Sequence, residues 1–156
     1  MTFSIPEPLK LEHSELHEEL AQATKAGGQV GEAAKAVARV LHGHFVDEEA
    51  FALPPLGVLA QMARGEIVAD ARQVVALTER LKSELPRMLS EHDAIVAAVQ
   101  ALIAAAQAES RPEFVRFAEK LMLHARTEEE VLYPAAILVG EHLKHTSGTR
   151  APAAAG

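Results

Sequence analysis

One pattern occurs twice in this chain, 80 positions apart. The first copy, HFVDEEAFALP, runs from His44 to Pro54, and the second, HARTEEEVLYP, runs from His124 to Pro134. In both copies the histidine is followed four residues later by a glutamate, then by a second glutamate, an apolar stretch and a proline. Because positions i and i+4 lie nearly above one another on a helix, each copy predicts one helix face that points an imidazole and a carboxylate at the same spot.

A second repeated feature precedes each copy. Glu12-His13 stands 31 residues before the first histidine of the pattern, and Glu91-His92 stands 32 residues before the second. The chain therefore divides into two similar halves, each with a lone histidine and then an HxxxE pair. These positions predict metal ligands at His13, His44, Glu48, His92, His124 and Glu128. Either pair alone would also fit an i,i+4 contact on the surface of an acidic helix, but two copies in the same register favour a metal site.

The donor atoms narrow the choice of metal. Imidazole and carboxylate groups suit iron, manganese or zinc, and they suit copper(I) poorly. The sequence contains no cysteine, which excludes thiolate zinc sites, iron–sulfur clusters and disulfide bonds. The predicted cofactor is therefore a metal held by histidine and glutamate.

Composition limits the partners. The net charge of −7 argues against non-specific binding of nucleic acid, which needs a basic surface. The N-terminal residues MTFSIPEPLK hold no apolar run long enough for a signal peptide, and no stretch of the sequence approaches the roughly 20 apolar residues of a membrane span. We therefore expect a cytoplasmic protein with no nucleic-acid partner and no membrane partner.

Apolar residues recur at helical spacing through most of the chain. The predicted helices cover residues 9–26, 29–52, 66–109 and 112–133. Gly27-Gly28 ends the first helix and Pro54 ends the second, and residues 56–65 form a connector with one short helical stretch at most. Pro86 predicts a kink or a break in the third helix. Pro134 either ends the fourth helix or kinks it, in which case the following apolar residues continue the helix.

The predicted fold class is all-α, an antiparallel four-helix bundle with a pseudo-two-fold half repeat. Only 4% of the residues are aromatic, which disfavours strands. At 156 residues the chain is most simply one domain, covering residues 1–145, with residues 146–156 as a disordered tail. Each long helix would carry one of the four histidines, so the four side chains could meet at one level of the bundle.

A lone histidine, an HxxxE pair, a second lone histidine and a second HxxxE pair, in that order, resemble the hemerythrin-like (HHE cation-binding) domain. The EEVLYP ending of the second copy is also typical of that family, and the resemblance covers about residues 8–143. Members are four-helix bundles that hold a non-haem di-iron centre. The resemblance implies two irons per chain with an oxo or hydroxo bridge, zinc or manganese as possible substitutes, and Glu48 and Glu128 as bridging ligands. It also implies that His13 and His44 bind one iron and that His92 and His124 bind the other.

One departure from the oxygen-carrying members of the family bears on function. Those proteins have five histidine ligands, including an HxxxH pair on the third helix, whereas here Val96 stands four residues after His92. This argues against reversible oxygen transport and leaves metal binding intact. His17 forms an HxxxH pair with His13 on the first helix. It is either a displaced fifth ligand or, as we favour, a residue outside the ligand set.

Other residues near the repeats receive simpler interpretations. His42 lies about 200° around the helix from His44, so we expect it to face away from the centre. Glu49 and Glu129 follow the ligand glutamates by 100°, and we interpret them mainly as surface charges. We expect Tyr133 to pack in the core.

The function predicted from these features is a metal-binding protein with a di-iron centre that binds or senses oxygen or nitric oxide. A redox enzyme that handles peroxide or nitric oxide is an alternative, and so are iron buffering and a purely structural metal. Ferritin-type centres use ExxH motifs with more carboxylates, which makes a ferroxidase a poorer fit. The sequence shows no nucleophile–base pair outside the metal set, so a binding protein is favoured over an enzyme.

Overall fold

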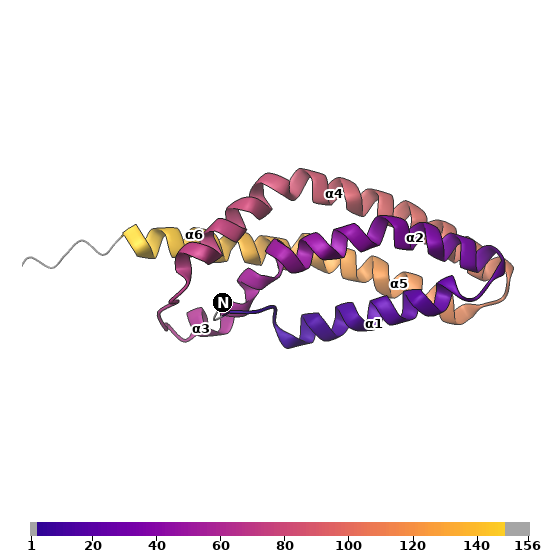
Figure 1. Cartoon of the computed structure of the whole chain (residues 1–156), viewed down its shortest axis with the longest axis horizontal. Helices are drawn as coiled ribbons and strands as arrows, with labels where there is room; N and C mark the ends of the chain where they lie inside the picture. The colour runs from indigo at the N-terminus through magenta and orange to yellow at the C-terminus, as the bar shows by residue number, and fades with distance from the viewer. Residues whose placement is uncertain (1–2, 149–156) are drawn as a thin grey trace, which may run out of the picture.

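Residues 3–148 are described by the structure, a computed structural model, and within that range all regular structure is helical. Four long rods run antiparallel to one another (Figure 1). The rods are α1 (Glu7–Thr24), α2 (Gly28–Asp47), α4 (Ala71–Ala108) and a fourth that joins α5 (Pro112–Thr127), a π-helical turn (Glu128–Leu132) and α6 (Tyr133–Gly148). The predicted all-α bundle is confirmed.

The side chain of Glu109 caps α2 at the end of the bundle, beside the α1–α2 turn. Gly27 and Gly28 turn the chain with φ angles of 72° and 59°, in the left-handed region that glycine adopts without strain. The carboxylate of Glu109, just after α4, accepts backbone N–H bonds from Gln29 at 2.6 Å and from Val30 at 3.4 Å. Glu109 thereby caps α2, because the first N–H groups of a helix lack partners within it and carry partial positive charge.

Each predicted ligand glutamate begins a π-helical turn, Glu48–Ala52 after α2 and Glu128–Leu132 after α5. The sequence predicted regular helix through both segments. Pro54 and Pro134 follow the two turns at the same distance. A proline cannot donate the i→i−4 hydrogen bond, and its ring clashes with the carbonyl of residue i−4; a wider turn ahead of each proline relieves both problems. π-Helical turns recur at functional sites, and here both begin at residues of the candidate centre.

The two halves diverge after these prolines. Pro54–Val58 forms a 3₁₀ turn that leads into the short α3 (Leu59–Ala63), so the second rod ends where the sequence predicted. Pro134 instead lies inside α6, which continues to Gly148, three residues beyond the predicted domain boundary. The rest of the predicted tail, residues 149–156, lies outside the described residues.

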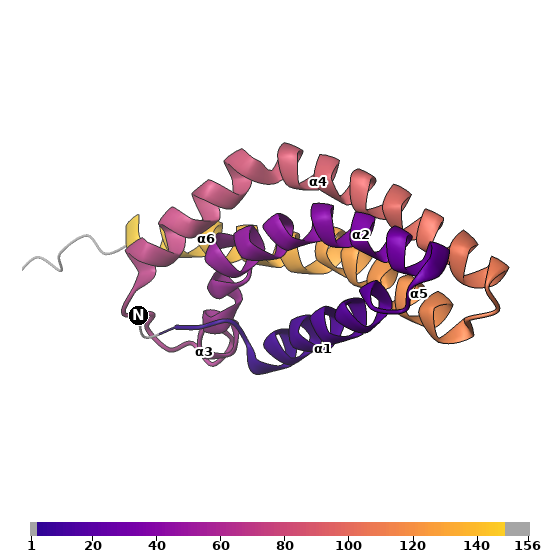
Figure 2. The same ribbon diagram turned by 45° about the vertical axis from the view of Figure 1, so that its right-hand side comes forward.

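α4 contains Pro86 without a break in its helical structure, and the rod arches along its length (Figure 2). By length and composition alone α4 could cross a membrane, since an 18-residue window has a mean hydropathy of 1.3. This finding differs from the expectation that no stretch approaches a span. In this structure 33% of that window is buried, and α4 carries His92 into the interior as a core helix of the bundle.

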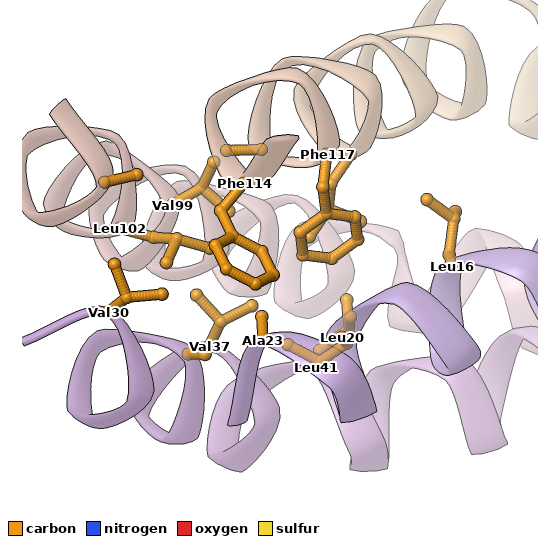
Figure 3. Close-up of a cluster of buried hydrophobic side chains, with 14 of the residues drawn as sticks. Leu16, Leu20, Ala23, Val30, Val37, Leu41, Val99, Leu102, Phe114 and Phe117 are labelled. Atoms are coloured by element: carbon orange, nitrogen blue, oxygen red, sulfur yellow. The ribbon is translucent and has the colours of Figure 1, made fainter. Parts of the chain in front are cut away.

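Two apolar layers fill the bundle on either side of a polar level. The first layer draws side chains from all four rods (Figure 3). Along α4, Ile95 belongs to this layer, Met88 belongs to the second layer, and His92 lies between them. The same order holds in the second rod, where Glu48 lies between one layer and the other. The predicted ligands therefore occupy the level at which the two apolar layers meet.

Candidate metal centre

The structure brings all six predicted ligands into one buried cluster. The four histidines come from four different rods, and their exposed fractions are 2%, 2%, 1% and 3% for His13, His44, His92 and His124. Glu48 and Glu128 lie between them and are 0% and 1% exposed. Charged residues are almost never this deeply buried unless they are paired or bind a metal.

The ligand atoms form two groups that share both glutamates. His13 and His124 belong to one group and His44 and His92 to the other, and within each group the ligand atoms all lie within 4.8 Å of one another. The pairing of His13 with His44, and of His92 with His124, is therefore wrong. The spacing of a sequence predicts which residues share a helix face, but each rod packs beside two others, and only the tertiary structure shows that His13 meets His124 and His44 meets His92.

Each inner glutamate presents one oxygen to each group. Oε1 of Glu48 lies 3.0 Å from Nε2 of His44, and its Oε2 lies 3.7 Å from Nε2 of His13. Oε1 of Glu128 lies 2.7 Å from Nε2 of His124, and its Oε2 lies 3.3 Å from Nε2 of His92. This is the arrangement that two carboxylates need in order to bridge two cations.

Four further glutamates lie beside the outer nitrogens of the histidines, and three of them accept a hydrogen bond there. Nδ1 of His44 donates to Glu91 at 2.7 Å, Nδ1 of His92 donates to Glu129 at 2.8 Å, and Nδ1 of His13 donates to Glu49 at 3.1 Å. Nδ1 of His124 lies 3.1 Å from Glu12 but is not hydrogen bonded to it. Because an ionised carboxylate only accepts hydrogen bonds, the three hydrogen bonds place the proton on Nδ1 and leave Nε2 of each of these histidines free to bind a cation.

These outer contacts correct the interpretation of Glu49 and Glu129 as surface charges. Their side chains are 48% and 41% exposed, yet each orients a predicted ligand. The contacts also follow the half repeat, since the glutamate of each Glu-His pair reaches the HxxxE histidine of the other half. The sequence contained a signal for Glu49 and Glu129, because each directly follows the predicted ligand glutamate of its copy.

Orphaned polar atoms test whether the cluster fits a cation. Four buried inward-facing atoms have no hydrogen-bond partner: Nε2 of His13, Nε2 of His124, Oε2 of Glu48 and Oε1 of Glu128. Each such atom costs roughly 1–3 kcal/mol when buried and unsatisfied. Nε2 of His44 and Nε2 of His92 face each other at 2.8 Å, and two lone pairs at that distance repel unless a proton or a metal cation lies between them. The donor set therefore fits bound metal.

Burial and charge also change the protonation of the histidines. Burial alone would lower the pKa of His44, but Glu48 and Glu91 outweigh it and raise that pKa to about 9. Burial is likewise outweighed for His124, where Glu128 raises the pKa to about 9. Without metal, protons thus neutralise part of the negative charge of the cluster, and a cation must displace them.

The two inner glutamates differ in protonation. Burial and the charge of the neighbouring Glu128 raise the pKa of Glu48. Burial would also raise the pKa of Glu128, but the close contacts with His124, His13 and His92 lower it well below its usual range. Two carboxyl groups this close do not ionise independently. Because the pKa of Glu128 is the lower of the two, Glu128 is the one that loses its proton first as the pH rises.

Tyr133 contributes more than the predicted core packing. Its ring is buried in the second apolar layer, with 1% exposure. Its hydroxyl, however, donates a hydrogen bond to Oε1 of Glu48 and lies 3.3 Å from Nε2 of both His44 and His92. The matching position in the first copy is Leu53, which has no polar group. A hydroxyl that occurs in only one copy was the sequence signal for this asymmetry.

His17 and His42 lie outside the cluster. Both side chains are exposed, and neither belongs to a group of ligand atoms. The ring of His17 contacts the edge of Phe45 with 4.8 Å between centroids, and the same Phe45 stacks on His13 at 4.2 Å. Phe45 thus contacts both histidines of the HxxxH pair, and only His13 reaches the centre.

The model of the hemerythrin HHE cation-binding domain matches residues 4–136 of this chain. The chain belongs to this family. No curated protein and no solved structure matches it. Family membership indicates cation binding, and the buried histidine–glutamate cluster of this hemerythrin-family protein fits a metal site.

Proposed function

We propose that this hemerythrin-family protein holds two iron ions per chain and uses them to bind or sense oxygen or nitric oxide. The observation that carries the proposal is the pair of ligand groups that share Glu48 and Glu128. Four histidines with two carboxylates form a set that iron favours, and His13, His124, His44 and His92 would supply two imidazoles to each ion. Iron bound there would supply affinity for a diatomic molecule and the capacity to change oxidation state.

The protein residues prepare such a centre in three ways. The outer glutamates fix the orientation of each imidazole, as Glu91 does for His44 at 2.7 Å. The apolar layers exclude water on both sides of the centre. In the metal-free protein Tyr133 donates a hydrogen bond to Oε1 of Glu48, and burial followed by the charges of Glu48 and Glu128 raises the pKa of its hydroxyl.

A surface cavity borders one of the predicted ligands. This cavity of about 540 Å³ lies between α4 and α5, and its lining includes His92, Val96 and Glu129. Val96 stands where the oxygen carriers have a further histidine, so the position one turn beyond His92 offers no further ligand. The absence of a histidine there, together with the position of His17 outside the cluster, favours sensing or redox chemistry over oxygen transport.

Tyr133 favours a second candidate function, a di-iron redox enzyme that acts on peroxide or nitric oxide. Reduction of either molecule consumes protons, and a hydroxyl lies 3.3 Å from two predicted ligand nitrogens. Peroxide consumption by the iron-loaded protein, compared with its Tyr133→Phe variant, distinguishes this function from simple binding.

A cytoplasmic location and the lack of nucleic-acid and membrane partners stay predictions from the sequence.

Reconstitution with iron(II) under anaerobic conditions tests the main proposal. We expect two irons per chain and a visible spectrum that changes on exposure to oxygen or to nitric oxide. A reproducible content of one iron or less would contradict the two-ion centre. An unchanged spectrum with both gases would leave the iron structural and contradict the sensing function.

A further inference from the structure

The two ligand groups make different contacts within the protein. We call the group of His13 and His124 the α1/α5 position and the group of His44 and His92 the α2/α4 position. At the α1/α5 position, both Nε2 atoms and the facing oxygens of Glu48 and Glu128 are buried without a hydrogen-bond partner. Nε2 of His124 lies 2.7 Å from Oε1 of Glu128 inside this group, but no side chain from outside the group is hydrogen bonded to these four atoms.

The donors of the α2/α4 position are instead hydrogen bonded, both to one another and to Tyr133. Nε2 of His44 lies 2.8 Å from Nε2 of His92. The hydroxyl of Tyr133 donates to Oε1 of Glu48, the oxygen that faces this position, and lies 3.3 Å from both Nε2 atoms. A cation that binds here must compete with Tyr133 for Glu48.

The contact between the two histidines also opposes a cation. Nε2 of His44 and Nε2 of His92 are hydrogen bonded at 2.8 Å, so a cation that binds both nitrogens must break this bond. The ring of His92 also packs against Tyr133, with 5.7 Å between centroids and 26° between planes, which restricts the movement of this imidazole.

At the α1/α5 position the neighbouring aromatic ring is that of Phe45. The ring of His13 stacks on Phe45 at 4.2 Å with 8° between planes, and the edge of His124 packs against the same Phe45 at 5.9 Å. The side chain of Phe45 has no polar atom that could hydrogen bond to a ligand nitrogen. Its packing holds both imidazoles in place while their Nε2 atoms stay available.

We propose that the two positions fill in order, the α1/α5 position first and the α2/α4 position only after the Tyr133 hydroxyl has released Glu48. Tyr133 is then a positioning residue that makes the metal affinity of the α2/α4 position lower than that of the α1/α5 position. When fewer than two ions per chain are supplied, the protein would accumulate as a form with one bound ion. This inference rests on the proposed two-ion centre. It adds an order of filling, which the repeat in the sequence does not contain.

Anaerobic titration of the metal-free protein with cobalt(II) or iron(II) tests the order. We expect two binding steps whose dissociation constants differ by at least about tenfold, the scale of one hydrogen bond to a charged group. Tyr133→Phe should tighten the second step by about tenfold and leave the first unchanged. Met88→Leu is the matched control, because Met88 is buried in the same apolar layer and lacks a hydroxyl; it should change neither step.

Ligand variants assign the steps to positions. His124→Ala, or His13→Gln if the first variant does not fold, should remove the tight step and leave a weak one. His92→Ala should remove the weak step and leave the tight one at one ion per chain. The reverse assignment would overturn the proposal, and so would a tyrosine variant with an unchanged second step.

The number of ions bound, and the number of binding steps, distinguish a failure of ordered filling from a failure of the two-ion centre. Two ions that bind the wild-type protein in one step with a single constant would overturn ordered filling and leave the two-ion centre standing. Uptake of no more than one ion by both the wild-type protein and Tyr133→Phe would overturn the two-ion centre and the order together. Thermal melting followed by circular dichroism establishes that each variant is folded.

Discussion

Glu91 and His44 are joined by a hydrogen bond of 2.7 Å between the carboxylate Oε2 and Nδ1 of the imidazole. The bond crosses from α4 to α2 and turns the other nitrogen of His44 towards the centre. Glu91 also accepts a hydrogen bond from Arg87, which in turn donates to Asp47 at 2.8 Å. A chain of charges at the surface thus fixes the orientation of a buried ligand.

Glu91→Gln should weaken metal binding about tenfold or more, because outer carboxylates orient the ligating imidazole and raise its basicity. Chelator competition at constant pH gives the affinity. Glu130→Gln is the control, since Glu130 is exposed and its ion pair is with Arg126 at 3.8 Å. Equal affinities for the two variants would mean that Glu91 does not act through His44.

The metal-free protein should lose stability as the pH rises from about 6.5 to about 9. The pKa values of His44 and His124 are raised to about 9 in the folded state, against about 6.5 in an unfolded chain. Their contribution is complete below pH 6.5 and is lost as the pH rises through the folded value. Thermal melts across this range measure the loss, and His44→Ala should reduce it.

Metal affinity should change in the opposite direction over the same range of pH. A histidine binds metal only after it loses its proton, so affinity should rise as the pH increases towards 9 and fall steeply towards pH 5. Proton release on metal binding, measured in two buffers of different ionisation enthalpy, checks this directly. An affinity that stays flat from pH 5 to pH 9 would exclude these histidines as ligands.

His17→Ala should leave the iron content, the visible spectrum and the autoxidation rate unchanged. His17 is exposed, and its ring contacts Phe45 and not the ligand groups. His13→Ala, one helical turn earlier on α1, should lower the iron content strongly. A spectral change in His17→Ala would place a fifth histidine on the centre.

Two glycine-to-alanine substitutions should change stability in opposite directions. A Cβ at Gly140 in α6 would lie 1.9 Å from Oγ1 of Thr78, a buried residue of α4, so Gly140→Ala should destabilise the bundle by roughly 1–3 kcal/mol. A Cβ at Gly43 in α2 meets nothing within 4 Å, so Gly43→Ala should stabilise by roughly 0.5–1 kcal/mol through helix propensity. Urea denaturation measures both changes. A Gly140 variant as stable as Gly43→Ala would show that Thr78 moves aside without cost.

The sequence by itself determined the fold class and the six residues that meet at the centre. Helical periodicity is a local property, and the i,i+4 spacing of His44 and Glu48 places both on one face whatever the rest of the chain does. The repeat then required a second, equivalent face. The family match over residues 4–136 agrees with that interpretation.

Only the tertiary structure decided which histidines share an ion position. His13 meets His124, and His44 meets His92, because neighbouring rods bring together residues that are far apart in the chain. The roles of Tyr133 and of the outer glutamates depend on the same contacts, as Tyr133 reaches Glu48 across 85 positions of sequence. Local spacing specifies where a side chain lies on its own helix, and the packing of helices against one another specifies what that side chain touches.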